Sequence, residues 1–129
     1  MRILAGVVIL GIASAVQSAP LTVKPGESWI FRVKDGQPAD ARKVTPTAKP
    51  SKGEVMVTVR SLFGTILITT NNSSVAYSFN AELFPGANLT AVRTCPLPAG
   101  GKPDLEQWQQ DAQAVRISNF RAAGSEHRC

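Results

Sequence analysis

The chain has 129 residues, with 14 Lys or Arg, 9 Asp or Glu and one His, which gives a formal net charge of +5. This length fits a single domain. The positive charge favours acidic partner surfaces, but Lys and Arg are too sparse for a nucleic-acid-binding protein, so the composition excludes that class.

Residues 1–19 have the order of a secretory signal peptide. Arg2 precedes an apolar run, Ile3–Val16, and small residues follow it. The run is shorter than the roughly 20 residues with which a helix spans a bilayer, so we expect cleavage rather than anchoring, at a site that several small residues leave ambiguous. The sequence therefore predicts an exported protein, periplasmic or secreted, in which residues 20–129 form one domain without a membrane span.

A period of two dominates the chain after this segment. A short strand is expected at "LTV", from Leu21 onward, and "SWIFRV" places Trp29, Phe31 and Val33 on one face. Alternation of this kind is typical of a strand with one buried face.

The stretch "DGQPADARKVTPTAKPSKG", residues 35–53, breaks this pattern with three prolines. We expect a long loop with at most a short edge strand around Val44, because proline cannot donate to a central ladder. Its second half contains four cations and no acid: Arg42, Lys43, Lys49 and Lys52. These side chains form the first candidate binding surface, for an acidic envelope polymer, a lipid head group or an acidic protein. A solvated loop without a ligand is the competing interpretation, and it carries more weight.

Three further strands are predicted between residues 54 and 84. "EVMVTVRSLF" turns Val55, Val57 and Val59 to one face, and "TILITT" follows after a hairpin turn at Gly64. "VAYSFNAEL" alternates without a break. We expect these three strands to form an antiparallel meander.

The last part of the chain contains two weaker strand candidates, "LTAVRTC" and "AVRISNF". Between them, Asp104 and Gln107 have the spacing of a capping box, which predicts one short helix or helical turn near 104–112 that carries Trp108. With about seven short strands, the fold class is all-β, a small antiparallel β-sandwich of immunoglobulin-like size. A small barrel is the alternative.

Both cysteines lie in this last part. In an exported chain, Cys95 and Cys129 most simply form one disulfide, because the compartments beyond the membrane are oxidising. Closing such a loop stabilises a domain by about 3–4 kcal/mol in the chain-entropy model. A bond between two molecules through Cys129 is the main alternative.

Catalytic and metal sites find little support. The single histidine, His127, lies two residues before Cys129 in a polar tail that would hold a general base poorly. Asp104, Glu106 and Asp111 match no ligand loop, and acids near a helix start are favoured by its dipole. We therefore predict a protein that is not an enzyme and needs no cofactor or metal.

Trp108 and Lys102 form a second candidate surface. Trp108 lies among polar residues in "EQWQQ" and fits either an exposed recognition aromatic or an apolar plug that holds the last segment onto the domain. The plug is the stronger interpretation.

No motif is specific enough to indicate a family. Fold, export and the lack of a catalytic set favour a small exported non-catalytic binding or interaction module. The alternative is a structural or accessory subunit of a cell-envelope assembly, joined through a strand edge or through Cys129.

Overall fold

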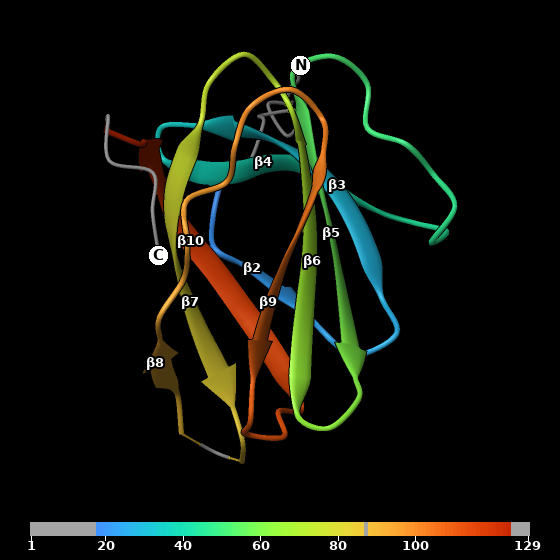
Figure 1. Ribbon diagram of the computed structural model, residues 1–129, viewed down its shortest axis with the longest axis vertical. Helices are drawn as coiled ribbons and strands as arrows, with labels where there is room; N and C mark the ends of the chain where they lie inside the picture. Colours follow the sequence, from blue (N-terminus) through green and yellow to red (C-terminus); the bar gives the residue numbers. More distant parts are fainter. Residues whose placement is uncertain (1–17, 87, 125–129) are drawn as a thin grey trace, which may run out of the picture.

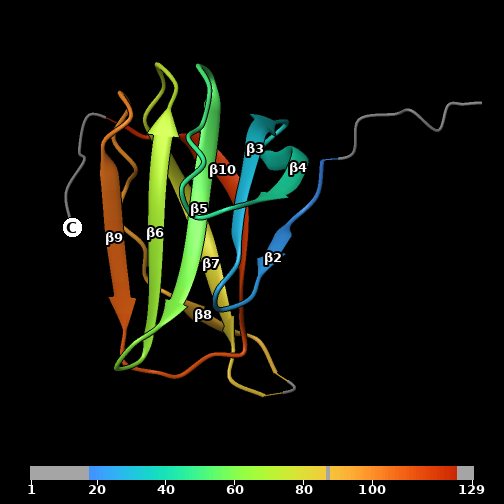
Figure 2. The same ribbon diagram turned by 90° about the vertical axis from the view of Figure 1, so that its right-hand side faces the viewer.

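A computed structural model describes residues 18–86 and 88–124 of the chain. These residues form two antiparallel sheets that face each other (Figures 1 and 2). The strand order is β2-β10-β7-β8 in the four-stranded sheet and β4-β3-β5-β6-β9 in the five-stranded sheet. The bounds are β2 (Leu21–Val23), β3 (Ser28–Lys34), β4 (Gln37–Val44), β5 (Glu54–Ser61), β6 (Thr65–Asn72), β7 (Tyr77–Phe84), β8 (Thr90–Val92), β9 (Pro103–Trp108) and β10 (Ala114–Ala122). The prediction of an all-β, sandwich-like fold is confirmed, with nine strands in the described part rather than about seven.

The core lies between the two sheets. Phe31, Val57 and Leu67 enter it from the five-stranded sheet, Phe79 and Ile117 enter it from the other, and none is more than 2% exposed. The alternation in the sequence therefore identifies the inward faces correctly. Burial of such side chains is the main term that holds two sheets together.

A bulge in β10 adds another aromatic ring to the core. The pairing of β10 with β7 shifts register after Ser118, and Asn119 adopts a positive φ of 55°. The extra residue turns both Ile117 and Phe120 inward, although they are three positions apart. The Phe120 ring stacks on Phe79 with 5.3 Å between the ring centroids.

The predicted helix near 104–112 is wrong. Residues Pro103–Trp108 form β9, which pairs with β6 along its whole length. Its inward positions are Asp104, Glu106 and Trp108, whereas Leu105 points outward and is 58% exposed. The strand was missed because two of its three inward side chains are acids, so its pattern lacks the usual apolar alternation.

The predicted loop at residues 35–53 is wrong in its first half. Residues Gln37–Val44 form β4, an edge strand that pairs with β3. The turn before it is Asp35-Gly36, with φ of 53° and 79°, the pair of positive angles that a tight two-residue hairpin requires. Pro38 is compatible with the strand because β4 lies at the edge of its sheet.

The predicted meander is also corrected. Strands β5 and β6 pair as expected, but β7 lies in the opposite sheet between β10 and β8. β9 occupies the edge of β6 that the meander assigned to β7. Alternation reveals which face of a strand is buried, but it does not reveal which strand lies beside it.

Three predictions fall outside the described residues. These are most of the signal peptide at residues 1–19, the tail with His127, and the pairing of Cys95 with Cys129, which stay predictions. Within residues 18–86 and 88–124, the structure contains no helix that is long and apolar enough to cross a bilayer.

Candidate functional site

The outer face of the five-stranded sheet carries several buried apolar side chains. While Val55, Val57 and Val59 of β5 point into the core, the intervening side chains point away from it. Among the outward side chains, Ile30, Met56 and Ile66 are only 1%, 8% and 8% exposed. Side chains outside the core become this buried only where another segment covers them.

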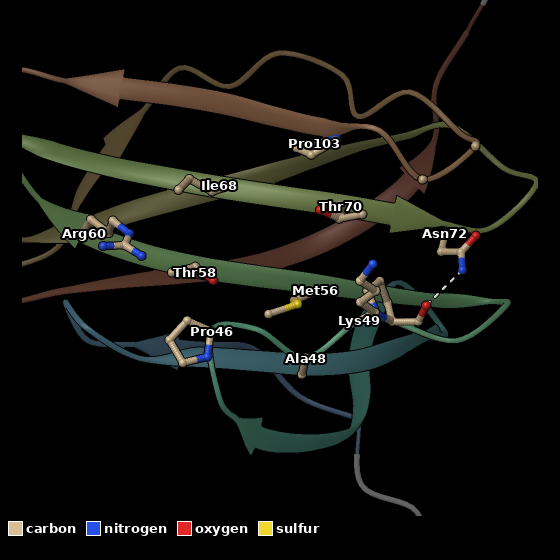
Figure 3. A pocket seen from close by; sticks show the side chains of 13 residues that line it. Pro46, Ala48, Lys49, Met56, Thr58, Arg60, Ile68, Thr70, Asn72 and Pro103 are labelled. Atoms are coloured by element: carbon tan, nitrogen blue, oxygen red, sulfur yellow. Dashed lines mark hydrogen bonds between the residues drawn. The ribbon is translucent and has the colours of Figure 1, made fainter.

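The covering loop, residues 45–53, follows β4 and leads into β5. Figure 3 shows Pro46, Ala48 and Lys49 of this loop lying along one side of the outward side chains of β5. The loop therefore converts a flat sheet face into a groove with a wall.

The groove has a volume of about 540 Å³. β5 and β6 form its floor, the covering loop forms one wall, and the turn before β9 forms the other (Figure 3). The floor residues are Met56, Thr58, Arg60, Ile68, Thr70 and Asn72, and the wall residues are Pro46, Ala48, Lys49, Pro50, Gly100, Gly101 and Pro103. We call this site the outer groove.

A buried carboxylate anchors the covering loop. Glu54 is 6% exposed, and its two oxygens accept hydrogen bonds from the Arg42 guanidinium at 3.1 and 3.3 Å. The carboxylate also accepts a bond from the backbone N–H of Ser51 at 2.8 Å. The Arg42 bonds outweigh the effect of burial and hold the pKa of Glu54 below its usual value.

Asn72 joins the covering loop to the end of β6. Its side-chain amide donates to the Pro50 carbonyl at 2.9 Å, and its backbone carbonyl accepts a hydrogen bond from the Gly53 N–H at 2.6 Å. On the opposite wall, the Gly101 N–H donates to the Asn71 carbonyl at 2.8 Å. Both walls are thus hydrogen-bonded to consecutive residues of β6, which fixes the width of the groove at this end.

The structure separates the four cations of the first candidate surface. Arg42 binds Glu54, and the Lys43 ammonium lies 3.3 Å from the Glu27 carboxylate. Lys49 lines the outer groove, and Lys52 is exposed beside it. Acids from β5 and from the turn before β3 therefore neutralise two of the four cations in a segment that contains no acid of its own.

Arg60 is a groove cation that was not among the predicted site residues. It is exposed and lines the groove at the opposite end from Lys49 (Figure 3). Among the described residues, neither Lys49 nor Arg60 forms an ion pair. The outward phase of Arg60 on β5 was readable from the sequence, but its position beside the covering loop was not.

The second candidate surface is not formed. Trp108 is 9% exposed, packs in the core, and donates its indole N–H to the Arg93 carbonyl at 2.9 Å. It acts as the apolar plug, so it is not available as a recognition aromatic. Lys102 is exposed in the turn between Gly101 and Pro103, at the rim of the outer groove.

Acidic residues on β9 face inward rather than into the groove. Burial raises the pKa of Asp104 and of Glu106, and the Glu106 carboxylate accepts a hydrogen bond from the Cys95 N–H. Asp111 lies beyond the strand, before β10. In the part of the chain that the structure describes, no three His, Cys, Asp or Glu side chains are grouped so that they could hold a metal ion.

No family model, curated protein or solved structure matches this chain. The functional argument therefore rests on the shape and charge of the outer groove.

Proposed function

We propose that the protein is a non-catalytic binding module whose outer groove holds an extended, acidic segment of a partner protein. The observation that carries this proposal is the combination of two apolar floor residues, Met56 and Ile68, with two cations that no described acid neutralises. These cations are Lys49 and Arg60. The apolar part of the floor gains free energy when side chains cover it, and the cations select the charge of the ligand.

The shape of the floor favours a polypeptide over a sugar polymer. None of the described lining residues is aromatic, so the groove offers no ring on which a sugar would stack. Met56 and Ile68 instead provide apolar contacts, and a methionine adapts to ligands of different shape.

The length of the groove fits an extended chain. Arg60 lies four residues beyond Met56 on β5, which corresponds to about 13 Å along a strand. A bound peptide in extended conformation would cover this length with about four residues. Acidic side chains near its two ends would then approach Lys49 and Arg60, while apolar side chains between them contact Met56 and Ile68.

Export to the periplasm or outside the cell is part of this proposal. An accessory subunit of an envelope assembly is the alternative, with contacts at a strand edge or through Cys129. Electrophoresis of the exported protein without reductant separates the two: a monomer without free thiols supports the internal bond, and a dimer that reductant splits supports assembly through Cys129.

A peptide titration tests the binding function. A short fluorescein-labelled peptide that alternates Glu and Val is added to the protein at low salt, and its anisotropy is followed. Removing one opposite charge near the surface costs about 1 kcal/mol, so we expect Lys49→Gln and Arg60→Gln each to weaken binding about fivefold. Lys34→Gln, an exposed cation of β3 outside the groove, is the matched control. The proposal fails if all three variants bind alike or if a Gln-Val peptide binds as tightly.

A further inference from the structure

Exposed apolar side chains gather at one end of the molecule, outside the lining of the outer groove. Of the five large hydrophobic side chains exposed in the described residues, Leu62 (56%), Phe63 (90%) and Leu89 (38%) lie in the β5–β6 and β7–β8 connections. Figure 1 shows these connections at the lower end, with the β9–β10 connection between them. We call Leu62 and Phe63 the apolar tip.

The backbone holds the apolar tip in its exposed position. Leu62 N–H donates to the Gly64 carbonyl at 3.0 Å, and the Gln107 side-chain amide donates to the Phe63 carbonyl at 3.4 Å. Phe63 has a positive φ of 51°, a conformation that costs free energy for a bulky residue. Gly64 has a φ of 106°, and a Cβ there would overlap the Trp108 carbonyl oxygen. The most exposed aromatic side chain of the described residues is therefore presented by a tight, well-bonded turn.

Cations accompany the apolar tip. Arg60 precedes it on β5 and is exposed. The exposed Lys24 begins the turn before β3, and this turn is bonded to β5 by Gly26 N–H donating to the Val59 carbonyl at 2.7 Å. Among the carboxylates described at this end, Glu27 is paired with Lys43, which leaves Asp111 as the one without an ion pair. The end is thus apolar at its tip and positive behind it.

We propose that this end docks on an anionic lipid bilayer, with Leu62 and Phe63 in the interface and with Arg60 and Lys24 at the head groups. A tip of apolar side chains backed by cations is the arrangement that lies stably at a bilayer surface, because each part meets the layer that solvates it. Leu62 and Phe63 project from one exposed turn and do not line a concave patch, so a fluid surface accommodates them more easily than a rigid protein pocket. This docking goes beyond the binding function of the outer groove: the two sites share Arg60, but Leu62, Phe63 and Lys24 lie outside the groove lining.

Sedimentation with vesicles tests the docking. The purified protein is mixed with vesicles of phosphatidylglycerol and phosphatidylcholine, or of phosphatidylcholine alone. We expect binding to the anionic vesicles, and at least about a tenfold loss of affinity in the double variant Leu62→Ser, Phe63→Ser. Val75→Ser, an exposed apolar residue in the connection between β6 and β7, is the matched control and should bind as the unchanged protein does. Equal binding by the double variant, or preference for neither vesicle, would overturn the proposal.

A second measurement reports on the tip directly. In Phe63→Trp, the emission of the new indole should shift to the blue when anionic vesicles are added, and in Val75→Trp it should not. If the emission of Phe63→Trp did not shift, insertion of the apolar tip would be contradicted, even if the protein bound the vesicles through another surface. The two sites are also separable, because the double variant should keep its affinity for the acidic peptide and Lys49→Gln should keep its affinity for vesicles.

Discussion

The two faces of the five-stranded sheet use similar side chains for different purposes. On the inner face, Phe31, Val57 and Leu67 pack against the four-stranded sheet and are fully buried. On the outer face, Met56 and Ile68 lie outside the core and line the groove beside the covering loop. Apolar side chains that the core does not need are informative, because Ile68 stays partly accessible in the groove and accessible apolar surface beside polar residues marks a place where something binds.

The carboxylates on the two faces differ as strongly. Glu54 on the outer face is buried but compensated by Arg42, whereas Glu106 on the inner face is buried with a backbone N–H as its hydrogen-bond partner. Their pKa values shift in opposite directions as a result. The outer carboxylate stabilises the groove wall, and the inner carboxylate costs stability when it is ionised.

The largest predicted effect separates two neighbours on β6. Leu67→Ala removes a fully buried side chain from the inner face and should lower the free energy of unfolding by about 3 kcal/mol. Ile68→Ala changes the next residue, which is half-buried on the outer face. It should lower the free energy of unfolding by about 1 kcal/mol but weaken binding of the acidic peptide several-fold. Urea denaturation and the peptide titration measure the two quantities. Equal losses of stability in the two variants, with no effect of Ile68→Ala on peptide binding, would contradict the different roles assigned to the two faces.

An intermediate effect is expected at the anchor of the covering loop. Arg42→Ala leaves the Glu54 carboxylate buried without its bidentate partner, so we expect a loss of about 1–2 kcal/mol in urea denaturation. Because the loop forms one wall of the groove, peptide affinity should fall as well. Lys43→Ala is the control, since its ion pair with Glu27 lies away from the groove lining. A Lys43→Ala protein as impaired in binding as Arg42→Ala would contradict this role of Glu54.

The smallest predicted effects depend on pH and have opposite signs on the two faces. A lowered pKa means that the Glu54 carboxylate adds stability above about pH 4.5, and this contribution is lost as the pH falls through the lowered pKa. Glu54→Gln should therefore be less stable than the unchanged protein at neutral pH and approach it in acid.

Glu106→Gln should behave in the reverse manner. A raised pKa means that ionisation of Glu106 removes stability as the pH rises from 4.5 through the raised value. The variant should be the more stable protein at neutral pH, with the difference vanishing as the pH falls to 4.5. Thermal unfolding of both variants across this pH range measures the stability of each relative to the unchanged protein. If both variants were stabilised, or both destabilised, at neutral pH, the environments of Glu54 and Glu106 would not differ as described.

The sequence predicted which face of each strand is buried better than it predicted which strands pair. Alternation is a local property, so the inward valines of β5 and the aromatic residues of β7 could be read directly. Most of β4 was missed, and only a short edge strand around Val44 was allowed for, although Asp35-Gly36 is a strong hairpin signal. The reason is that Pro38 and the prolines after it indicated a loop. β9 was missed because acids occupy two of its inward positions. One of them, Glu106, accepts a hydrogen bond from the Cys95 N–H, and the sequence alone does not reveal this contact.

The candidate site was predicted in part. Lys49 was selected for its charge and does line the groove, but Arg42 and Lys43 were selected for the same reason and are ion-paired. Their partners come from β5 and from the turn before β3, and charge along the chain does not reveal such pairs. The groove itself depends on the path of the covering loop, which no local pattern specifies.

The most direct test of the central claim is to map where the acidic peptide binds. Amide chemical shifts of the isotope-labelled protein are followed by NMR while the Glu-Val peptide is added. We predict that the shifted residues lie in the covering loop, on the outward positions of β5 and β6, and in the turn before β9. Shifts confined to the four-stranded sheet, or no shifts at peptide concentrations that saturate the anisotropy signal, would contradict the outer groove as the binding site.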